Sequence, residues 1–300
     1  MERAGSQAQR PTEGGPPEGP AIEPGAVRLR VADLALEGEF YERVIGLQPL
    51  EVNGEVTRLG VDGTAVVELH PSATASPRPS STTGLFHLAI VVPGRAALAR
   101  ALAHVVGAGW RLSGASDHLV SEALYLSDPE DNGIEIYRDR PRSEWRYDGD
   151  DLQMSTLPLD LDGLISEVGV SRASDGGMEA GTRIGHVHLN VADLGDAEEF
   201  YAGVLGFDVT VRGYPGALFL STGGYHHHIG LNTWAGPGAS PPPEDSRGLV
   251  WFELEAEGPA VVDELSGRLE RAGAEVEALP AGIHTRDPSG NGVLIRTAAA

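Results

Sequence analysis

The 300-residue sequence contains no cysteine. Disulfides, thiolate zinc sites, iron–sulfur clusters and cysteine nucleophiles are therefore excluded, and any bound metal must be held by histidine, aspartate or glutamate. Basic residues are also scarce: 22 Lys and Arg stand against 44 Asp and Glu, which gives a formal net charge of −22. Because an acidic surface repels phosphates, we expect no nucleic-acid partner and a small-molecule ligand instead.

Long hydrophobic runs are missing as well. No apolar stretch approaches the roughly 18 residues of a membrane-spanning segment, and the N-terminal residues lack the apolar core of a signal peptide. We therefore expect no membrane association and a cytoplasmic location. The sequence leaves open whether the chain forms a homo-oligomer.

The chain is organised as a duplication. Residues 31–50 and 191–210 share Val, Ala, Asp, Leu, Glu, Phe, Tyr, Val and Gly at an offset of 160 residues. A second motif, Asp-Pro followed by Asn-Gly, recurs at an offset of 159 residues, beginning at Asp128 and Asp287. Two independent matches at nearly the same offset indicate two related halves.

Each half in turn contains two similar units. In each unit a strand-like run leads into an amphipathic helix and then into several short strands. In units one and three we expect the helix to end at Gly46 and Gly206, where a left-handed cap is typical. The four units span about 26–70, 84–137, 184–233 and 248–297.

The predicted fold class is α+β, with four βαβββ units in two duplicated halves that form curved half-barrel sheets around a metal cavity. Residues 1–24 are rich in proline, glycine and charge, and we expect a disordered tail there. We place an N-terminal domain at 25–140 and a C-terminal domain at 184–300. Residues 141–183 form the linker between them and include one short helix.

Potential metal ligands are unevenly distributed over the four units. At the inward positions of the first and last strands, units two and three carry His87, Glu135, His186 and His227. The matching positions in units one and four are Ala26, Val67, Trp251 and Leu294, which cannot bind a metal. Two histidines and one carboxylate with an open coordination side form the facial triad of non-haem Fe(II) oxygenases, and Mn(II) accepts the same ligands.

Each of these residues has an alternative, purely structural interpretation. A single histidine on a strand, such as His87, is more often a hydrogen-bonded core residue than a ligand. Glu135 alternates with Ile134 and Ile136, so it faces away from both, and an unpaired carboxylate on an inward face is costly unless a partner or a metal neutralises it. His186 and His188 share a face, so either one could be the ligand and the other its neighbour.

Three consecutive histidines, His226, His227 and His228, precede an apolar run. On a strand, successive side chains point to opposite faces. We therefore expect His227 to face the metal cavity and its two neighbours to face the other side. A surface patch of tandem histidines that scavenges metal is the alternative.

Three stretches resemble the vicinal-oxygen-chelate superfamily, which includes glyoxalase I, fosfomycin-resistance proteins and extradiol ring-cleaving dioxygenases. They are HVHLNVADLGDAEEFYAGVLGF at 186–207, LYLSDPEDNGIEIY at 124–137 and GGYHHHIGLNTWAG at 223–236. The resemblance covers all four units. The combination of residues 117–137 with residues 223–234 is most similar to the catechol 2,3-dioxygenase-like branch.

This resemblance implies an extradiol dioxygenase that uses Fe(II) and O₂ to cleave a small catechol-type aromatic diol to a muconic semialdehyde-type acid. It implies that His87, Glu135 and His186 bind the iron. Tyr125 would hydrogen-bond the bound catecholate and His227 would take a substrate proton. Further site residues are predicted at His118, which falls near another active-site histidine of the family, and at the substrate contacts His188, Asn190 and Trp234.

The predicted site departs from the family pattern in one respect. In many two-domain extradiol dioxygenases the metal lies within the C-terminal half, but unit four carries Trp251 and Leu294 where ligands are needed. The site therefore requires unit two to pair with unit three, leaving units one and four as a vestigial partner site.

Two other functions remain open. One is a glyoxalase-like metal-dependent isomerase or transferase, which often has a second glutamate where His227 stands, and the other is a non-catalytic protein of the bleomycin-resistance type.

Overall fold

The computed structural model describes residues 22–53, 55–149, 151–167 and 177–298. Residues 1–21 of the predicted tail lie outside the described residues, and so do residues 168–176 of the predicted linker. Residues 22–24, at the end of the predicted tail, belong to the first strand.

Strands of units one and four form the first sheet. They are β1 (Ile22–Val31), β2 (Gln48–Val52), β3 (Thr57–Val61), β4 (Thr64–Pro71), β16 (Gly248–Ala256), β17 (Glu277–Leu279), β18 (Gly282–Arg286) and β19 (Gly292–Thr297). Their order in the sheet is β17-β18-β19-β16-β1-β4-β3-β2. The first and last units of the chain are therefore neighbours, joined by the antiparallel pair β1 and β16.

Strands of units two and three form the second sheet, to which the predicted linker adds one edge strand. They are β5 (Gly84–Val91), β6 (Gly114–Asp117), β7 (Ser121–Ser127), β8 (Gly133–Asp139), β11 (Leu157–Pro158), β12 (Arg183–Asn190), β13 (Asp208–Val211), β14 (Ala217–Ser221) and β15 (Ile229–Asn232). Their order is β11-β6-β7-β8-β5-β12-β15-β14-β13, with β5 and β12 antiparallel at the centre. Unit two thus pairs with unit three, as the metal site requires.

The helices are short and lie outside the sheets. They are α1 (Leu34–Phe40), the π-helical turn η1 (Tyr41–Ile45), α2 (Arg95–Gly107), the 3₁₀ turn η2 (Arg142–Glu144), α3 (Leu161–Ser166), α4 (Leu194–Glu198), the π-helical turn η3 (Glu199–Val204) and α5 (Pro259–Arg271). None of the described helices combines the length and apolar character needed to cross a membrane. This mixed arrangement confirms the predicted α+β class.

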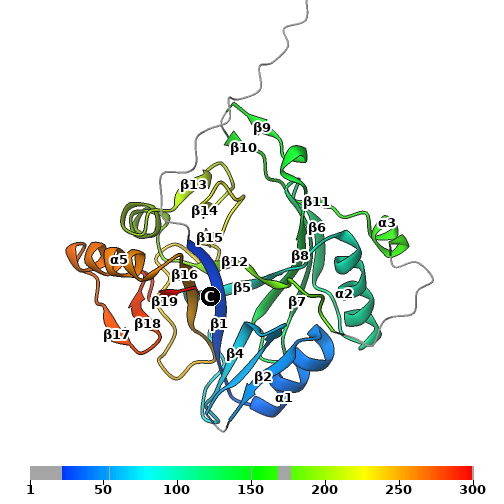
Figure 1. Ribbon diagram of the computed structural model, residues 1–300, viewed down its shortest axis with the longest axis horizontal. Helices are drawn as coiled ribbons and strands as arrows, with labels where there is room; N and C mark the ends of the chain where they lie inside the picture. Colours follow the sequence, from blue (N-terminus) through cyan, green and yellow to red (C-terminus); the bar gives the residue numbers. More distant parts are fainter. Residues whose placement is uncertain (1–21, 54, 150, 168–176, 299–300) are drawn as a thin grey trace, which may run out of the picture.

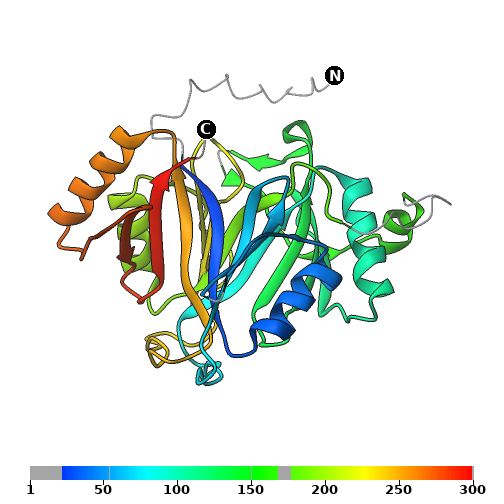
Figure 2. The same cartoon turned by 60° about the horizontal axis from the view of Figure 1, so that its bottom comes forward.

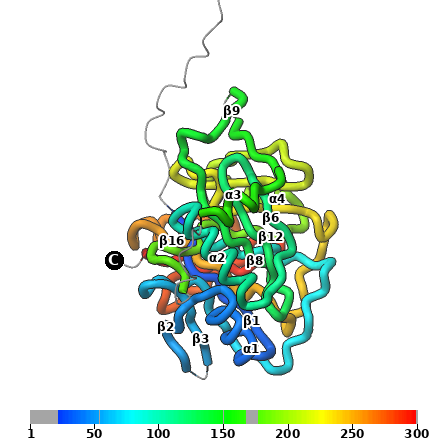
Figure 3. Tube along the Cα trace, turned by 90° about the vertical axis from the view of Figure 1, so that its right-hand side faces the viewer, coloured from blue at the N-terminus to red at the C-terminus, as the bar shows by residue number. Residues whose placement is uncertain are grey.

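The two sheets meet along their central strands, where β1 of the first sheet contacts β12 of the second. Helices α2 and α5 lie at opposite ends of the molecule (Figures 1 and 2). A small hairpin of β9 (Tyr147–Asp148) and β10 (Asp151–Leu152) projects at one extreme (Figure 3). The hairpin lies in the predicted linker, so this segment contains ordered structure besides its short helix, α3.

The first repeated motif encodes the two ends of a helix. Asp33 and Asp193 precede α1 and α4, and their carboxylates accept backbone N–H groups of the first turn, as capping residues do. The π-helical turns η1 and η3 continue these helices, and Gly46 and Gly206 follow their ends with φ angles of 88° and 85°, in the left-handed region. Both glycines therefore stand where the predicted helix ends require them.

The second repeated motif ties the two units of each half together. Asp128, in the turn before β8, accepts backbone N–H groups of its own turn and the hydroxyl of Tyr41, at 3.1 Å. Asp287 repeats this arrangement with Tyr201, also at 3.1 Å. Each half contributes one unit to each sheet, and a buried Tyr–Asp hydrogen bond links the two units of that half.

Glu37 in α1 departs from the repeat, because Ala197 stands at the matching position of the second half. Its side chain is fully buried, and neither carboxylate oxygen has a hydrogen-bond partner among the residues that the structure describes. Burial, together with the negative charges of Asp128 and Glu130, raises the pKa of Glu37 to about 9. Glu37 is therefore protonated in the folded protein at neutral pH.

We expect Glu37 to make folding less favourable as the pH rises. A glutamate in the unfolded chain ionises near its ordinary pKa of about 4.3, whereas in the folded protein it keeps its proton up to about pH 9. Across this window stability falls by up to about 1.4 kcal/mol per pH unit. Glu37→Gln should flatten the fall in unfolding free energy between about pH 5 and pH 8 in urea titrations. Parallel profiles of the two proteins would contradict this.

Candidate metal centre

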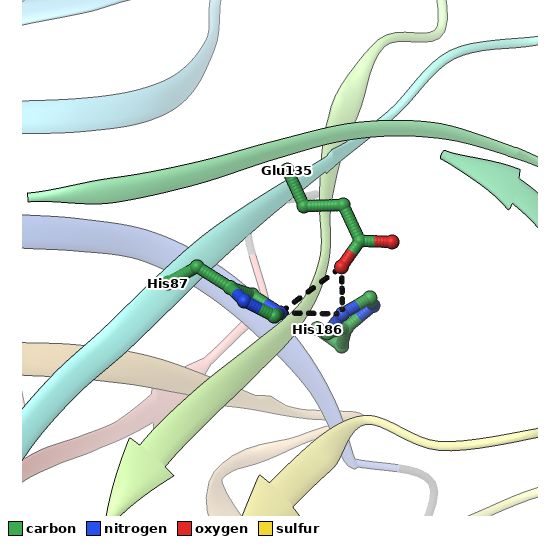
Figure 4. Close-up of side chains that lie close together, drawn as sticks. All are labelled: His87, Glu135 and His186. Carbon is green, nitrogen blue, oxygen red and sulfur yellow. Dashed lines mark hydrogen bonds and ion pairs between the residues drawn. The ribbon is translucent and has the colours of Figure 1, made fainter. Parts of the chain in front are cut away.

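Three neighbouring strands, β8, β5 and β12, bring the predicted ligands to one face of the second sheet. Ala89 on β5 pairs with Glu135 on β8 and, on its other side, with His186 on β12. His87 precedes Ala89 by two residues, so it points to the same face. The side chains of His87, Glu135 and His186 point toward one another from these three strands (Figure 4).

The three donor atoms lie close together. Oε2 of Glu135 is 3.0 Å from Nε2 of His87 and 3.2 Å from Nε2 of His186, and the two nitrogens are 3.4 Å apart (Figure 4). At metal–ligand bonds of about 2.1 Å, donors on one face of an octahedron lie about 3.0 Å apart. The spacing and the donor types therefore fit one divalent cation.

The electrostatics of these groups also suit a cation. Burial lowers the pKa of His186 to about 4, so its imidazole is neutral and has a lone pair to donate. Burial alone would raise the pKa of Glu135, but the neighbouring His186 and His87 outweigh it and hold that pKa well below its ordinary value. Glu135 therefore provides a buried negative charge at neutral pH.

A cavity of about 660 Å³ opens beside the three donors. All nine site residues predicted from the sequence line it, namely His87, His118, Tyr125, Glu135, His186, His188, Asn190, His227 and Trp234. Its size is that of a small-molecule site. Of the two histidines on β12, it is His186, and not His188, that approaches His87 and Glu135 closely enough to share a cation.

Tyr125 and His118 form a hydrogen-bonded pair in the cavity wall. Nε2 of His118 is 2.7 Å from the Tyr125 hydroxyl, and Nδ1 of His118 is 2.7 Å from the carbonyl oxygen of Ser155. Since a carbonyl only accepts, Nδ1 of His118 carries a proton, and an unprotonated Nε2 accepts the hydroxyl proton of Tyr125. Burial and the negative charge of Glu135 raise the pKa of Tyr125 well above its ordinary value, so it remains a phenol.

The run of three histidines does not lie on a strand, so that expectation is wrong. It follows a turn at Gly223, where φ is 63°, and precedes β15. The placement of His227 nevertheless agrees with the expectation, because His227 lines the cavity and its ring lies 4.1 Å from that of His186. His226 and His228 lie outside the cavity lining, and all three are buried, which excludes a surface metal-scavenging patch.

Two groups of cavity residues could not be found from the sequence. Met154, Ser155 and Thr156 come from the predicted linker, which shows no periodicity because it packs as a loop. Phe86 is adjacent to His87, so strand alternation places it on the opposite face. The pairing of β5 with β12 is irregular between His87 and Leu85, and this bulge lets Phe86 line the cavity too.

The corresponding face of the first sheet contains ion pairs instead of the ligand set. Glu68 accepts a hydrogen bond from Nε of Arg28, at 2.7 Å, and forms an ion pair with Arg58, at 2.8 Å. The guanidinium of Arg28 also lies 4.0 Å from the ring centre of Trp251, the residue that matches His87. In the described part of the chain, the ligand set occurs on the second sheet alone.

Comparison with known families agrees with this architecture. The model of the Glyoxalase/Bleomycin resistance protein/Dioxygenase superfamily matches residues 24–136 and again residues 183–295, once in each half. Together the two matches cover well over half of the sequence. The chain therefore belongs to this superfamily, whose name covers both enzymes and resistance proteins.

Individual proteins resemble this chain at different levels. It is 43% identical over 270 residues to a catechol-2,3-dioxygenase of Bacillus subtilis (strain 168), a match that covers 88% of this chain and 93% of the relative. Glyoxalase I from Zea mays has a similar fold, with a TM-score of 0.57, 15% identity and 92% of each chain covered. A Bacillus subtilis protein assigned as a dioxygenase gives a TM-score of 0.65 at 13% identity, covering 93% of this chain and 86% of its own. These two structures establish similarity of fold alone.

Proposed function

We propose that this protein is an extradiol ring-cleaving dioxygenase that opens a catechol-type aromatic diol with O₂ and Fe(II). The observation that carries the proposal is the convergence of His87, Glu135 and His186, from opposite halves of the chain, in a cavity that also holds Tyr125 and His227. The 43% identity to a protein named catechol-2,3-dioxygenase supports this choice among the activities of the superfamily.

His87, Glu135 and His186 would hold the metal, and their two imidazoles and one carboxylate leave an open side toward the cavity. When bound, ferrous iron supplies Lewis acidity toward the diol oxygens and the one-electron chemistry that O₂ requires. The same donor set accepts Mn(II), so we propose Fe(II) on the basis of the chemistry and of the named relative.

The side chains around the donors have separate roles toward the diol. Because the Tyr125 proton points to His118, the Tyr125 oxygen is left with lone pairs to accept a hydrogen bond from a substrate hydroxyl. Burial lowers the pKa of His227 well below its ordinary value, so its imidazole is neutral and able to accept a substrate proton. Phe86 and Trp234, with ring centres 5.1 Å apart, offer apolar surface to the aromatic ring.

The two alternative functions fit the cavity less well. A glyoxalase-like isomerase or transferase often places a second glutamate where His227 stands, and here a neutral imidazole occupies that position. In a metal-free binding protein, three donors within 3.4 Å of one another around a buried carboxylate are not expected, because burying a charge without a metal or another neutralising partner is costly.

The test is a ring-cleavage assay. The protein is purified without oxygen and loaded with ferrous iron, and air-saturated catechol, methylcatechols, chlorocatechols and hydroquinones are then added. We expect a yellow ring-fission product from at least one ortho-diol and none from the hydroquinones. No absorbance change with any diol, in protein shown to contain iron, would refute the proposed function.

A further inference from the structure

Two hydrogen bonds lead from His227 away from the cavity. Nδ1 of His227 is 2.7 Å from Nδ1 of His226, and Nε2 of His226 is 2.8 Å from Oδ1 of Asp139 at the end of β8. His226 is completely buried, while 32% of the Asp139 side chain is exposed. Neither residue lines the cavity.

When each ring carries one proton, these two contacts determine where the protons lie. A carboxylate only accepts hydrogen bonds, so His226 must carry a proton on Nε2 to bond with Asp139. In a neutral imidazole the other nitrogen, Nδ1, is then an acceptor. The short contact between the two Nδ1 atoms therefore requires the proton of His227 to lie on Nδ1. This leaves Nε2 of His227 with a free lone pair.

The surroundings hold this arrangement in place. The Tyr225 hydroxyl donates to both carboxylate oxygens of Asp139, at 2.9 and 3.0 Å, and lies 2.7 Å from the Tyr137 hydroxyl. Because Tyr225 donates to Asp139, Tyr137 must donate to Tyr225. The Tyr225 ring also packs on His226, with ring centres 4.0 Å apart. Asp139 therefore has fixed partners, and the His226 ring has little freedom to turn over.

We propose that Asp139 and His226 are positioning residues that fix the tautomer of His227, so that Nε2 of His227 is the base for the diol proton. The inference rests on the proposed function for the identity of that proton. A second proton on His226 would make its Nδ1 a donor and force the His227 proton onto Nε2, so that His227 would no longer be a base. A turned His226 ring would present carbon atoms to both partners and leave the tautomer of His227 unfixed.

The tautomers can be measured without any turnover. Nitrogen-15 NMR of full-length protein with labelled histidines distinguishes a protonated from an unprotonated ring nitrogen, and His226→Asn and His227→Asn identify the signals. We expect protons on Nε2 of His226 and on Nδ1 of His227 in the wild type. In Asp139→Ala we expect both tautomers of each ring. A wild-type His227 with its proton on Nε2 would overturn the inference.

Kinetics of matched variants test the consequence for catalysis. His226→Phe keeps the ring volume but removes the acceptor, whereas His226→Asn loses volume but keeps an oxygen near the place of Nδ1. We expect kcat to fall about 100-fold in His226→Phe with an almost unchanged KM, and to stay within about tenfold of wild type in His226→Asn. If His226 only filled space, Asn would be at least as damaging as Phe, and that order would contradict the proposal.

The two proposals fail in different ways. A wild-type protein that contains iron and has the expected tautomers, but cleaves no diol, refutes the proposed function and leaves the tautomer assignment standing. A wild-type protein that cleaves a diol, together with a His226→Phe variant of equal kcat, refutes the positioning role alone.

Discussion

Glu135→Ala is expected to lose the metal and, with it, all ring cleavage. Glu135 is the single carboxylate donor of the three, and without it two imidazoles with nitrogens 3.4 Å apart remain. We expect Fe(II) affinity to fall by well over about 100-fold, since loss of residues that merely support a ligand already lowers metal affinity about 10–100-fold. Chelator competition gives the affinity, and metal analysis after gel filtration gives the iron content of each protein.

Glu68→Gln is the matched control for this variant. Glu68 is also a buried acid on the corresponding sheet face, but its partners are Arg28 and Arg58. We expect Glu68→Gln to lower the unfolding free energy and to leave Fe(II) affinity unchanged, because breaking a buried ion pair leaves uncompensated positive charge. Unchanged iron content in Glu135→Ala would show that Glu135 is not a ligand.

His227→Ala is expected to keep the metal and to lose turnover. The variant leaves the three donor side chains in place but removes the neutral imidazole beside them, the proposed acceptor of the diol proton. We expect kcat to fall about 10²–10⁴-fold, the usual contribution of general acid–base catalysis. Steady-state kinetics at saturating O₂, with the iron content of the same samples, measures this.

The adjacent histidine provides the control. Nδ1 of His228 accepts the backbone N–H of Thr222 at 3.2 Å, away from the cavity lining. We expect His228→Asn to keep kcat within a few-fold of wild type and to lose only stability. Loss of iron from His227→Ala would make His227 a ligand, and wild-type turnover in that variant would remove its role as a base.

The architecture could be predicted from the sequence because the repeats are strong and local. The Asp33 and Asp193 caps and the glycines that end their helices each encode one helix, so the repeat and the α+β class could be recognised without distant contacts. The pairing of unit two with unit three could be predicted from chemistry, because this pairing completes the set of metal ligands. Each half is held together by a long-range hydrogen bond, from Tyr41 to Asp128 in the first half and from Tyr201 to Asp287 in the second. A single sequence does not reveal such contacts.

The details of the cavity were harder to predict because they depend on departures from regular structure. Phe86 lines the cavity through a bulge, and the three histidines lie in a bend before β15, so alternation along a strand could not place either. The loop around Ser155 contributes a backbone carbonyl to His118, and a backbone group carries no sequence signal. The Asp139–His226 contact likewise joins residues 87 positions apart.

The most direct test of the account is anomalous diffraction at the iron edge from crystals of the full-length protein soaked anaerobically in ferrous salt. We predict one strong peak per chain, within about 2.0–2.3 Å of Nε2 of His87, Nε2 of His186 and a carboxylate oxygen of Glu135. A peak at any other place, or bound by His227 or His188 in place of one of these three, would contradict the claim that two imidazoles and one carboxylate from opposite halves share a single cation.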